Sequence, residues 1–266
     1  VCDGSSVSAT LLSSVPPGAT YTWTNSNTSI GLASGGNGDV PLFWGTNPSS
    51  SIISGTITVT PTLSGCIGTS SNYTISVKAR PMAIVPANQT YCDGAAVAAI
   101  NFTSTPPGGS YGWFNNDPSI GTAGAGSNSI PAFTATNSGT SMVTATIEVA
   151  AIVNGCMGPN VPFNISVKPS PNAIVPANQT VCLGTVLGAS SFSSSPAGAS
   201  FTWSNALTSI GLAASGSGNV PAFTAANSGA TTLTASIVVT PTLNGCVGTG
   251  SSYDIVVKPS PILVSP

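Results

Sequence analysis

Apolar and polar residues alternate along several short segments of this 266-residue chain. In the segment 55–61, GTITVTP, Ile57 and Val59 alternate with polar neighbours, and a similar pattern returns at 145–151 and 235–241. Such alternation places one face of a strand in a core and leaves the other face in water, as in an antiparallel sheet. The pattern therefore predicts half-buried β-strands.

Other short segments, rich in aromatic and β-branched residues, also read as strands. They lie at 19–25, 109–115 and 199–205; at 73–78, 163–168 and 253–258; and at 40–46, 130–136 and 220–226. Gly, Pro, Asn and Ser separate these segments, and no segment has the pattern of a long amphipathic helix. Six or seven short strands per unit with turn signals between them are typical of a β-sandwich.

The chain repeats itself every 90 residues. Two sets of cysteines and one set of tryptophans keep this spacing. They are Cys2, Cys92 and Cys182; Cys66, Cys156 and Cys246; and Trp23, Trp113 and Trp203. Ninety residues is the size of a small domain with its own core. We therefore expect an all-β fold, a tandem array of three Ig-like β-sandwich domains.

The domain boundaries follow from the same register. We expect repeat 1 at residues 1–80, truncated at its N-terminus, repeat 2 at 81–170 and repeat 3 at 171–260, with 261–266 as the start of the next linker. The linkers carry paired prolines, which stiffen the chain, and the motif AIVP, a candidate first strand of the following sandwich. This predicts a rod with limited bending.

Charge is scarce, and its scarcity excludes several functions. The chain has four Lys and Arg, six Asp and Glu, no His, and a net charge of −2. Histidine-based catalysis is therefore excluded, and the few basic residues cannot build a surface for nucleic acid. The scattered acids do not form the cluster that a calcium site needs. We expect no enzyme activity, no cofactor, no metal site, and no membrane insertion by this segment, since its apolar runs are short.

The six cysteines predict disulfides in an oxidising compartment. One pairing closes each repeat on itself, and we favour it because each domain could then fold alone. It joins Cys2 to Cys66, Cys92 to Cys156, and Cys182 to Cys246. The alternative bridges the junctions by joining Cys66 to Cys92 and Cys156 to Cys182, and leaves Cys2 and Cys246 for repeats elsewhere.

The tryptophans divide into two kinds. Trp23, Trp113 and Trp203 follow an aromatic residue two positions earlier, so both rings point the same way, and we expect them in the core. A sugar-binding platform is the alternative role. Trp44 stands where the other repeats have Thr, next to Phe43, and is a candidate exposed contact.

One glycine-rich loop phrase recurs: TSIGLASGGNGDVP at 28–41 and TSIGLAASGSGNVP at 208–221. It reads as a structural turn, because it has no aromatic residue and Asp39 is its one charged residue, whereas recognition loops use aromatic or charged anchors. A ligand-contacting loop is the alternative.

Read together, these phrases resemble a known family. Units built on ANQTVC, ASFTWSN, TSIGLAASGSGNVPAFTAANSG, LTASIVVTPTLNGCVG and YDIVVKPSP are similar to the PKD-like repeats of large cell-surface adhesins of Bacteroidetes. They are especially similar to the repetitive stalks of gliding-motility adhesins exported by the type IX secretion system. The resemblance implies PKD-like β-sandwiches, an extracellular location at the cell surface, and a stalk or filament role.

The same resemblance implies partners. They are neighbouring repeats of the same chain, surface polysaccharide, other copies of the protein, and the gliding or secretion machinery. In the alternative function, the repeats themselves bind carbohydrate or another cell.

Overall fold

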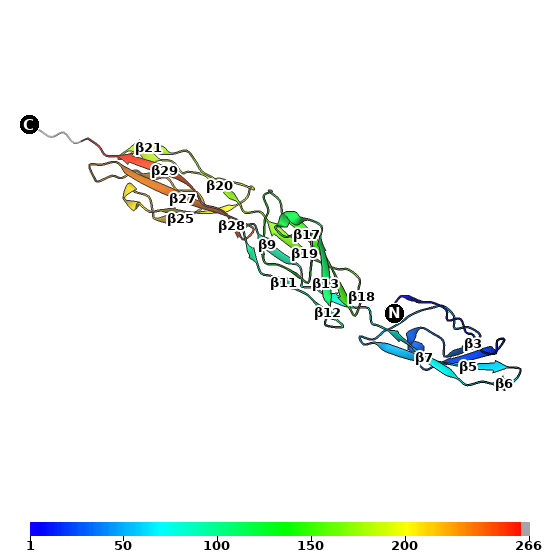
Figure 1. Ribbon diagram of the computed structural model, residues 1–266. Coiled ribbons are helices and arrows are strands. Elements are labelled where there is room, and N and C mark those ends of the chain that lie inside the picture. The colour runs from blue at the N-terminus through cyan, green and yellow to red at the C-terminus, as the bar shows by residue number, and fades with distance from the viewer. Residues whose placement is uncertain (262–266) are drawn as a thin grey trace, which may run out of the picture.

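The molecule is a row of β-domains that lie end to end, with β6 (Cys66–Ile67) at one end and β21 (Gln179–Cys182) near the other (Figure 1). The computed structural model describes residues 1–261. The predicted all-β fold is confirmed, because the regular elements of these residues are strands and three single-turn 3₁₀ helices. Most of the expected next linker, 261–266, lies outside the described residues.

The repeats use closely similar sets of elements. Repeat 1 contains β1 (Ser6–Val7), β2 (Thr20–Asn25), η1 (Thr28–Ile30), β3 (Gly35–Asn37), β4 (Phe43–Trp44), β5 (Ile53–Leu63), β6 and β7 (Ser71–Val77). Repeat 2 contains β8 (Met82–Ile84), β9 (Gln89–Cys92), β10 (Ala96–Val97), β11 (Ile100–Asn101), β12 (Thr103–Thr105), β13 (Ser110–Asn115), η2 (Pro118–Ile120), β14 (Ala125–Ser127), β15 (Ser129–Ile130), β16 (Phe133–Thr134), β17 (Val143–Val153), β18 (Cys156–Met157) and β19 (Val161–Lys168). Repeat 3 contains β20 (Asn172–Ile174), β21, β22 (Val186–Leu187), β23 (Ser193–Ser195), β24 (Ser200–Asn205), η3 (Thr208–Ile210), β25 (Ser215–Ser217), β26 (Phe223–Thr224), β27 (Leu233–Leu243), β28 (Cys246–Val247) and β29 (Ser251–Lys258).

Each repeat has one large sheet and a set of short strand pairs. In repeat 2 the large sheet has the order β14-β13-β17-β19-β9, with β18 also paired to β17, and its short pairs are β8–β12, β10–β16 and β11–β15. Neighbours in the large sheet are antiparallel except β19 and β9, which run parallel. The linker strand β9, near the start of repeat 2, is therefore paired with β19, the last strand of the same repeat.

The longest strand of each repeat, β5, β17 or β27, has 11 residues. At about 3.4 Å per residue, such a strand is about 37 Å long and runs along most of its domain. Its alternate residues face the core, as the sequence pattern predicted: Ile57, Ile147 and Ile237 are fully buried. Buried side chains form three separate clusters, one drawn from each expected repeat.

Trp23, Trp113 and Trp203 lie in these cores, with exposed fractions of 4–5%. Each indole lies against a glycine of the neighbouring strand. A Cβ added to Gly216 would lie 2.4 Å from Cζ2 of Trp203. Only a residue without a side chain leaves room for the ring, so this glycine and the tryptophan form one packing unit.

The recurring loop phrase forms part of the core. In repeat 1 it folds into the 3₁₀ turn η1, whose Ile30 is fully buried. Gly31 follows with a φ of 94°, and a Cβ there would lie 2.2 Å from the carbonyl oxygen of Trp44. The isoleucine and the glycine thus explain the repeated phrase by packing and backbone geometry.

Repeat 1 lacks the strand pair that a linker forms in the other repeats. The linker strands β8 and β20 pair with β12 and β23, respectively. Residues 13–15 occupy the register of β12 and β23 but form no strand.

Replacing Trp203 with Ala is expected to lower the free energy of unfolding of repeat 3 by about 3–5 kcal/mol, because it leaves a large cavity in the core. Trp44→Ala is the matched control, since Trp44 is 63% exposed. It is expected to change stability by less than about 0.5 kcal/mol. Denaturant unfolding followed by circular dichroism measures both, and equal losses would contradict the assignment of Trp203 to the core.

Candidate functional site at the repeat junctions

Two disulfides join neighbouring repeats. Cys2 of repeat 1 bonds to Cys156 of repeat 2, and Cys92 of repeat 2 bonds to Cys246 of repeat 3. Both bonds span 154 residues of sequence. The first-set cysteine of one repeat thus pairs with the second-set cysteine of the next.

This pairing contradicts both of the predicted sets. In repeat 1, Cys2 lies beside Lys78 at the end of β7, next to the junction with repeat 2. Cys66 pairs with Leu63 at the far end of β5. About ten strand residues, or roughly 34 Å, separate the two ends, whereas a disulfide needs Cα atoms within about 7 Å. Cys2–Cys66 and its counterparts Cys92–Cys156 and Cys182–Cys246 therefore cannot form.

The junction-bridging alternative fails for the same reason. Cys92 lies at the far end of repeat 2, where it pairs with Lys168, whereas Cys66 lies at the opposite end of the molecule. The expectation that all six cysteines are oxidised is also wrong for this chain. Cys66 and Cys182 are exposed free thiols among the described residues.

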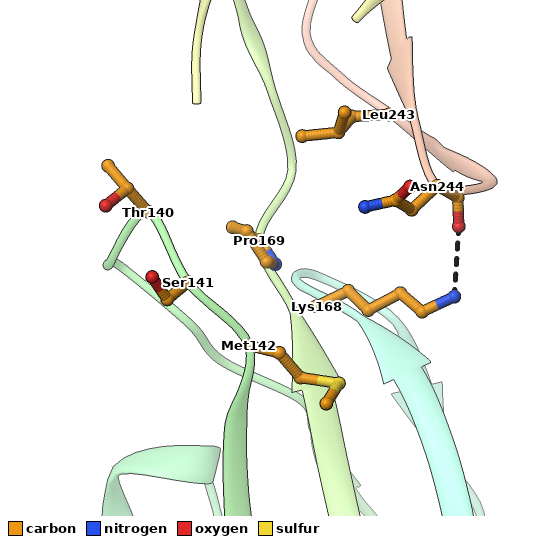
Figure 2. Close-up of a pocket in the computed structure, with 7 residues that line it drawn as sticks. All are labelled: Thr140, Ser141, Met142, Lys168, Pro169, Leu243 and Asn244. Carbon is orange, nitrogen blue, oxygen red and sulfur yellow. Dashed lines mark hydrogen bonds between the residues drawn. The ribbon is translucent and has the colours of Figure 1, made fainter. Parts of the chain in front are cut away.

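A lysine crosses each junction beside the disulfide. Nζ of Lys78 donates to the carbonyl oxygen of Asn154 at 2.8 Å, and Nζ of Lys168 donates to that of Asn244 at 3.0 Å. Figure 2 shows the Lys168 side chain reaching toward the β27–β28 turn of repeat 3. Asn154 and Asn244 have φ values of 53° and 52°, so each carbonyl belongs to a tight turn. This contact explains why Lys78 and Lys168 recur at the 90-residue spacing.

A linker proline packs against a glycine of the same sandwich. A Cβ added to Gly158 would lie 1.9 Å from the carbonyl oxygen of Pro81, and one added to Gly248 would lie 1.7 Å from that of Pro171. These distances exclude any side chain. Beside the second contact, the hydroxyl of Ser251 donates to the carbonyl oxygen of Ala173 at 3.0 Å. Glycine at this position therefore allows the linker to enter the sandwich.

An open hollow of about 660 Å³ lies at the second junction (Figure 2). Its walls come from both repeats: Thr140, Ser141, Met142, Lys168, Pro169, Leu243 and Asn244. Lys168 is the one ionisable side chain in this lining, and its amino group already donates to Asn244. The lining contains the hydroxyl groups of Thr140 and Ser141 but no acid–base pair beside them.

The remaining predicted sites are placed as follows. Trp44 is 63% exposed on β4, which pairs with β1; its role as a contact stays a prediction. Across residues 1–261, no three His, Cys, Asp or Glu side chains gather as metal ligands would. In the same range, no helix has the length and apolar character needed to cross a membrane.

Burial raises the pKa of the Tyr253 hydroxyl in the core of repeat 3.

The chain was compared with known proteins. Residues 1–81 match a family model described as PKD-like domain, and no curated protein matches. Mouse cadherin-23 EC22–24 is 10% identical, over 90% of this chain and 86% of that chain, with a TM-score of 0.37. Protocadherin gamma B7 domains 1–4 are 11% identical, over 89% and 66%, with a TM-score of 0.38. The insect immune protein hemolin is 15% identical, over 96% and 71%, with a TM-score of 0.35.

Removing one junction disulfide is expected to weaken and loosen the rod. The double variant Cys92→Ser/Cys246→Ser should lower the free energy of unfolding by up to about 5 kcal/mol, because a loop of about 150 residues is no longer closed in the unfolded chain. Cys66→Ser/Cys182→Ser is the matched control, since both thiols are free. Denaturant unfolding measures this difference.

Small-angle scattering of the same proteins tests the shape. Three 37 Å strands laid end to end give a rod with a radius of gyration of about 32 Å, whereas a compact globule of this length would have about 18 Å. The wild type and the control should give the rod value, and Cys92→Ser/Cys246→Ser a broader distribution. Equal behaviour of the two double variants would contradict a mechanical role for the junction disulfide.

Proposed function

We propose that this chain is a stalk segment of a large secreted bacterial cell-surface adhesin. Its repeats hold a binding region away from the cell, or form part of a filament used in gliding motility or surface attachment. The similarity to Bacteroidetes adhesins exported by type IX secretion motivates this assignment. The observation that carries it is the pair of disulfides, Cys2–Cys156 and Cys92–Cys246, which cross the junctions.

A stalk must transmit force without separating its domains. Each junction is held by the main chain, by a disulfide and by a lysine that donates to the next repeat. In the chain-entropy model, closing a loop of about 150 residues stabilises the folded array by about 5 kcal/mol. The bonds also prevent complete extension when a domain unfolds, because the chain on both sides of each junction stays joined.

The chemistry of the surface agrees with a structural role outside the cell. Disulfides persist in oxidising, extracellular compartments. Ten charged residues among 266 leave a surface with little long-range repulsion between domains. We therefore also propose that the segment is not catalytic and that its first partners are neighbouring repeats.

The second candidate is a module whose repeats bind carbohydrate or another cell. One observation favours it: Trp44 is 63% exposed, and Leu42 beside it is 59% exposed. An exposed indole can stack on a sugar ring, but Thr134 and Thr224 replace Trp44 in the other repeats. A contact present in one repeat fits a spacer better than a repeated binding surface.

A glycan array probed with the 1–266 chain separates the two functions. The stalk assignment predicts no saturable binding to any glycan, with Trp44→Ala indistinguishable from wild type. Saturable binding that Trp44→Ala abolishes would overturn the spacer and establish the binding module. Saturable binding that survives this substitution would also overturn it and direct attention to the other repeats.

A further inference from the structure

The two junction disulfides divide the chain between them into three segments. Cys2–Cys156 forms one fixed point, here called bridge A, and Cys92–Cys246 forms a second, called bridge B. The chain leaves bridge A for bridge B, returns to bridge A, and then runs to bridge B again. The segments are Cys2–Cys92, with 90 residues, Cys92–Cys156, with 64 residues, and Cys156–Cys246, with 90 residues. All three therefore connect the same two points.

Each segment contains the body of one repeat. The first holds β1 to β7 of repeat 1, the second holds β10 to β17 of repeat 2, and the third holds β20 to β27 of repeat 3. Figure 1 shows β18, which carries Cys156, beside repeat 1, and β28, which carries Cys246, beside repeat 2. The two bridges thus lie at opposite ends of repeat 2, about 37 Å apart, the length of its 11-residue strand β17.

The fold of repeat 1 shortens the first segment. Cys2 and Lys78 lie side by side, because the backbone N–H of Asp3 donates to the carbonyl oxygen of Lys78 at 2.9 Å. The N–H of Lys78 in turn donates to the carbonyl oxygen of Val1 at 2.8 Å. While repeat 1 is folded, only the residues from Lys78 to Cys92 reach from bridge A to bridge B, and they span at most about 50 Å.

Repeat 3 shortens the third segment in the same way. Asn172 forms a β-bridge with Thr249, close to Cys246, so the folded repeat holds its entry strand beside bridge B. Only the residues from Cys156 to Asn172 then reach between the bridges, and they span at most about 58 Å. Half of them already form the extended strand β19, so little length is left to release.

Repeat 2 itself closes the second segment. Cys92 pairs with Lys168 at one end of the domain, and Cys156 pairs with Val153 at the other end, where β17 finishes. A force that moves the bridges apart therefore stretches repeat 2 along its central strand.

We propose that the two disulfides make the three repeats resist an axial load together rather than one after another. In a row of domains joined only by linkers, each domain carries the whole force, and the weakest one opens first. Here bridges A and B can move apart by no more than about 20 Å until all three repeats have been pulled open. The first two repeats to open release no length. This deepens the proposed stalk function, and its use to the cell rests on that function.

The same arrangement limits how far the opened array can extend. The segment of 64 residues from Cys92 to Cys156 becomes taut at about 220 Å, whereas each segment of 90 residues could reach about 320 Å. The two longer segments therefore stay slack, and the shortest one sets the final distance between the bridges.

Single-molecule stretching between tags on the two termini tests the proposal. With both bridges intact, the stretched path contains about 85 residues and has a contour length of about 300 Å. The bridges should separate in one step. Cys66→Ser/Cys182→Ser is the matched control and should behave as the wild type, because neither cysteine belongs to a bridge. Separate steps for individual repeats in the wild type would overturn the proposal.

Removing one bridge should lengthen the path and separate the repeats. Cys92→Ser/Cys246→Ser leaves about 111 residues in the path, so the contour length should rise to about 390 Å. Repeat 3 should then open in a step of its own at a lower force. Cys2→Ser/Cys156→Ser should give the same length, with repeat 1 opening in its own step. A contour length that neither substitution increases would also overturn the proposal.

This outcome is separable from the stalk function. A wild type that opens one repeat at a time, yet scatters as a rod and binds no glycan, would leave the stalk assignment standing and remove only the sharing of load. Saturable glycan binding together with a single opening step would do the reverse.

Discussion

The placement of the two cysteines of each repeat at opposite ends of a long sheet determines how the array is held together. The 11-residue central strand separates the ends by more than a disulfide can span. Each sulfur can therefore bond only across a junction. The cross-links, the lysine contacts and the entry of the linker all gather at that one place, and the interior of each sandwich is left to apolar packing.

The sandwiches rely on apolar packing, and several of their buried asparagines are held by hydrogen bonds to nearby backbone groups. Asn137 is buried, and its side-chain amide donates to the carbonyl oxygens of Ser141 and Val167, while its Oδ1 accepts from the backbone N–H of Gly139. Asn47 and Asn227 make the corresponding contacts in the other repeats. A buried side-chain amide of this kind supplies hydrogen-bond partners to backbone groups that would otherwise have none. It therefore holds the loop in place without adding charge.

Much of the fold could be predicted from the sequence, because the signals are local. Alternation around Ile57 identified the central strand, and the aromatic residue two positions before Trp203 predicted its buried ring. The register of 90 residues predicted the array. These features depend on one strand and its face, which neighbouring residues determine.

The pairing of cysteines could not be predicted in this way. A spacing of 64 residues between Cys2 and Cys66 says nothing about which ends of a domain they occupy, and a constant period makes a partner one repeat away equally regular. Two other sets of residues at the 90-residue spacing could have helped: the lysines that begin with Lys78, and the glycines Gly68, Gly158 and Gly248. Their recurrence is explained by contacts at the junctions, which only the three-dimensional arrangement reveals.

Peptide mapping without reduction is the most direct test of the disulfides that cross the junctions. Since Lys and Arg are sparse, pepsin is better suited than trypsin for the digestion, and mass spectrometry then identifies the linked peptides. The account predicts that the peptide containing Cys2 is linked to the one containing Cys156, and that of Cys92 to that of Cys246. A link between Cys2 and Cys66, or between Cys92 and Cys156, would contradict it, because each repeat would then be closed on itself and its junctions left without a covalent bridge.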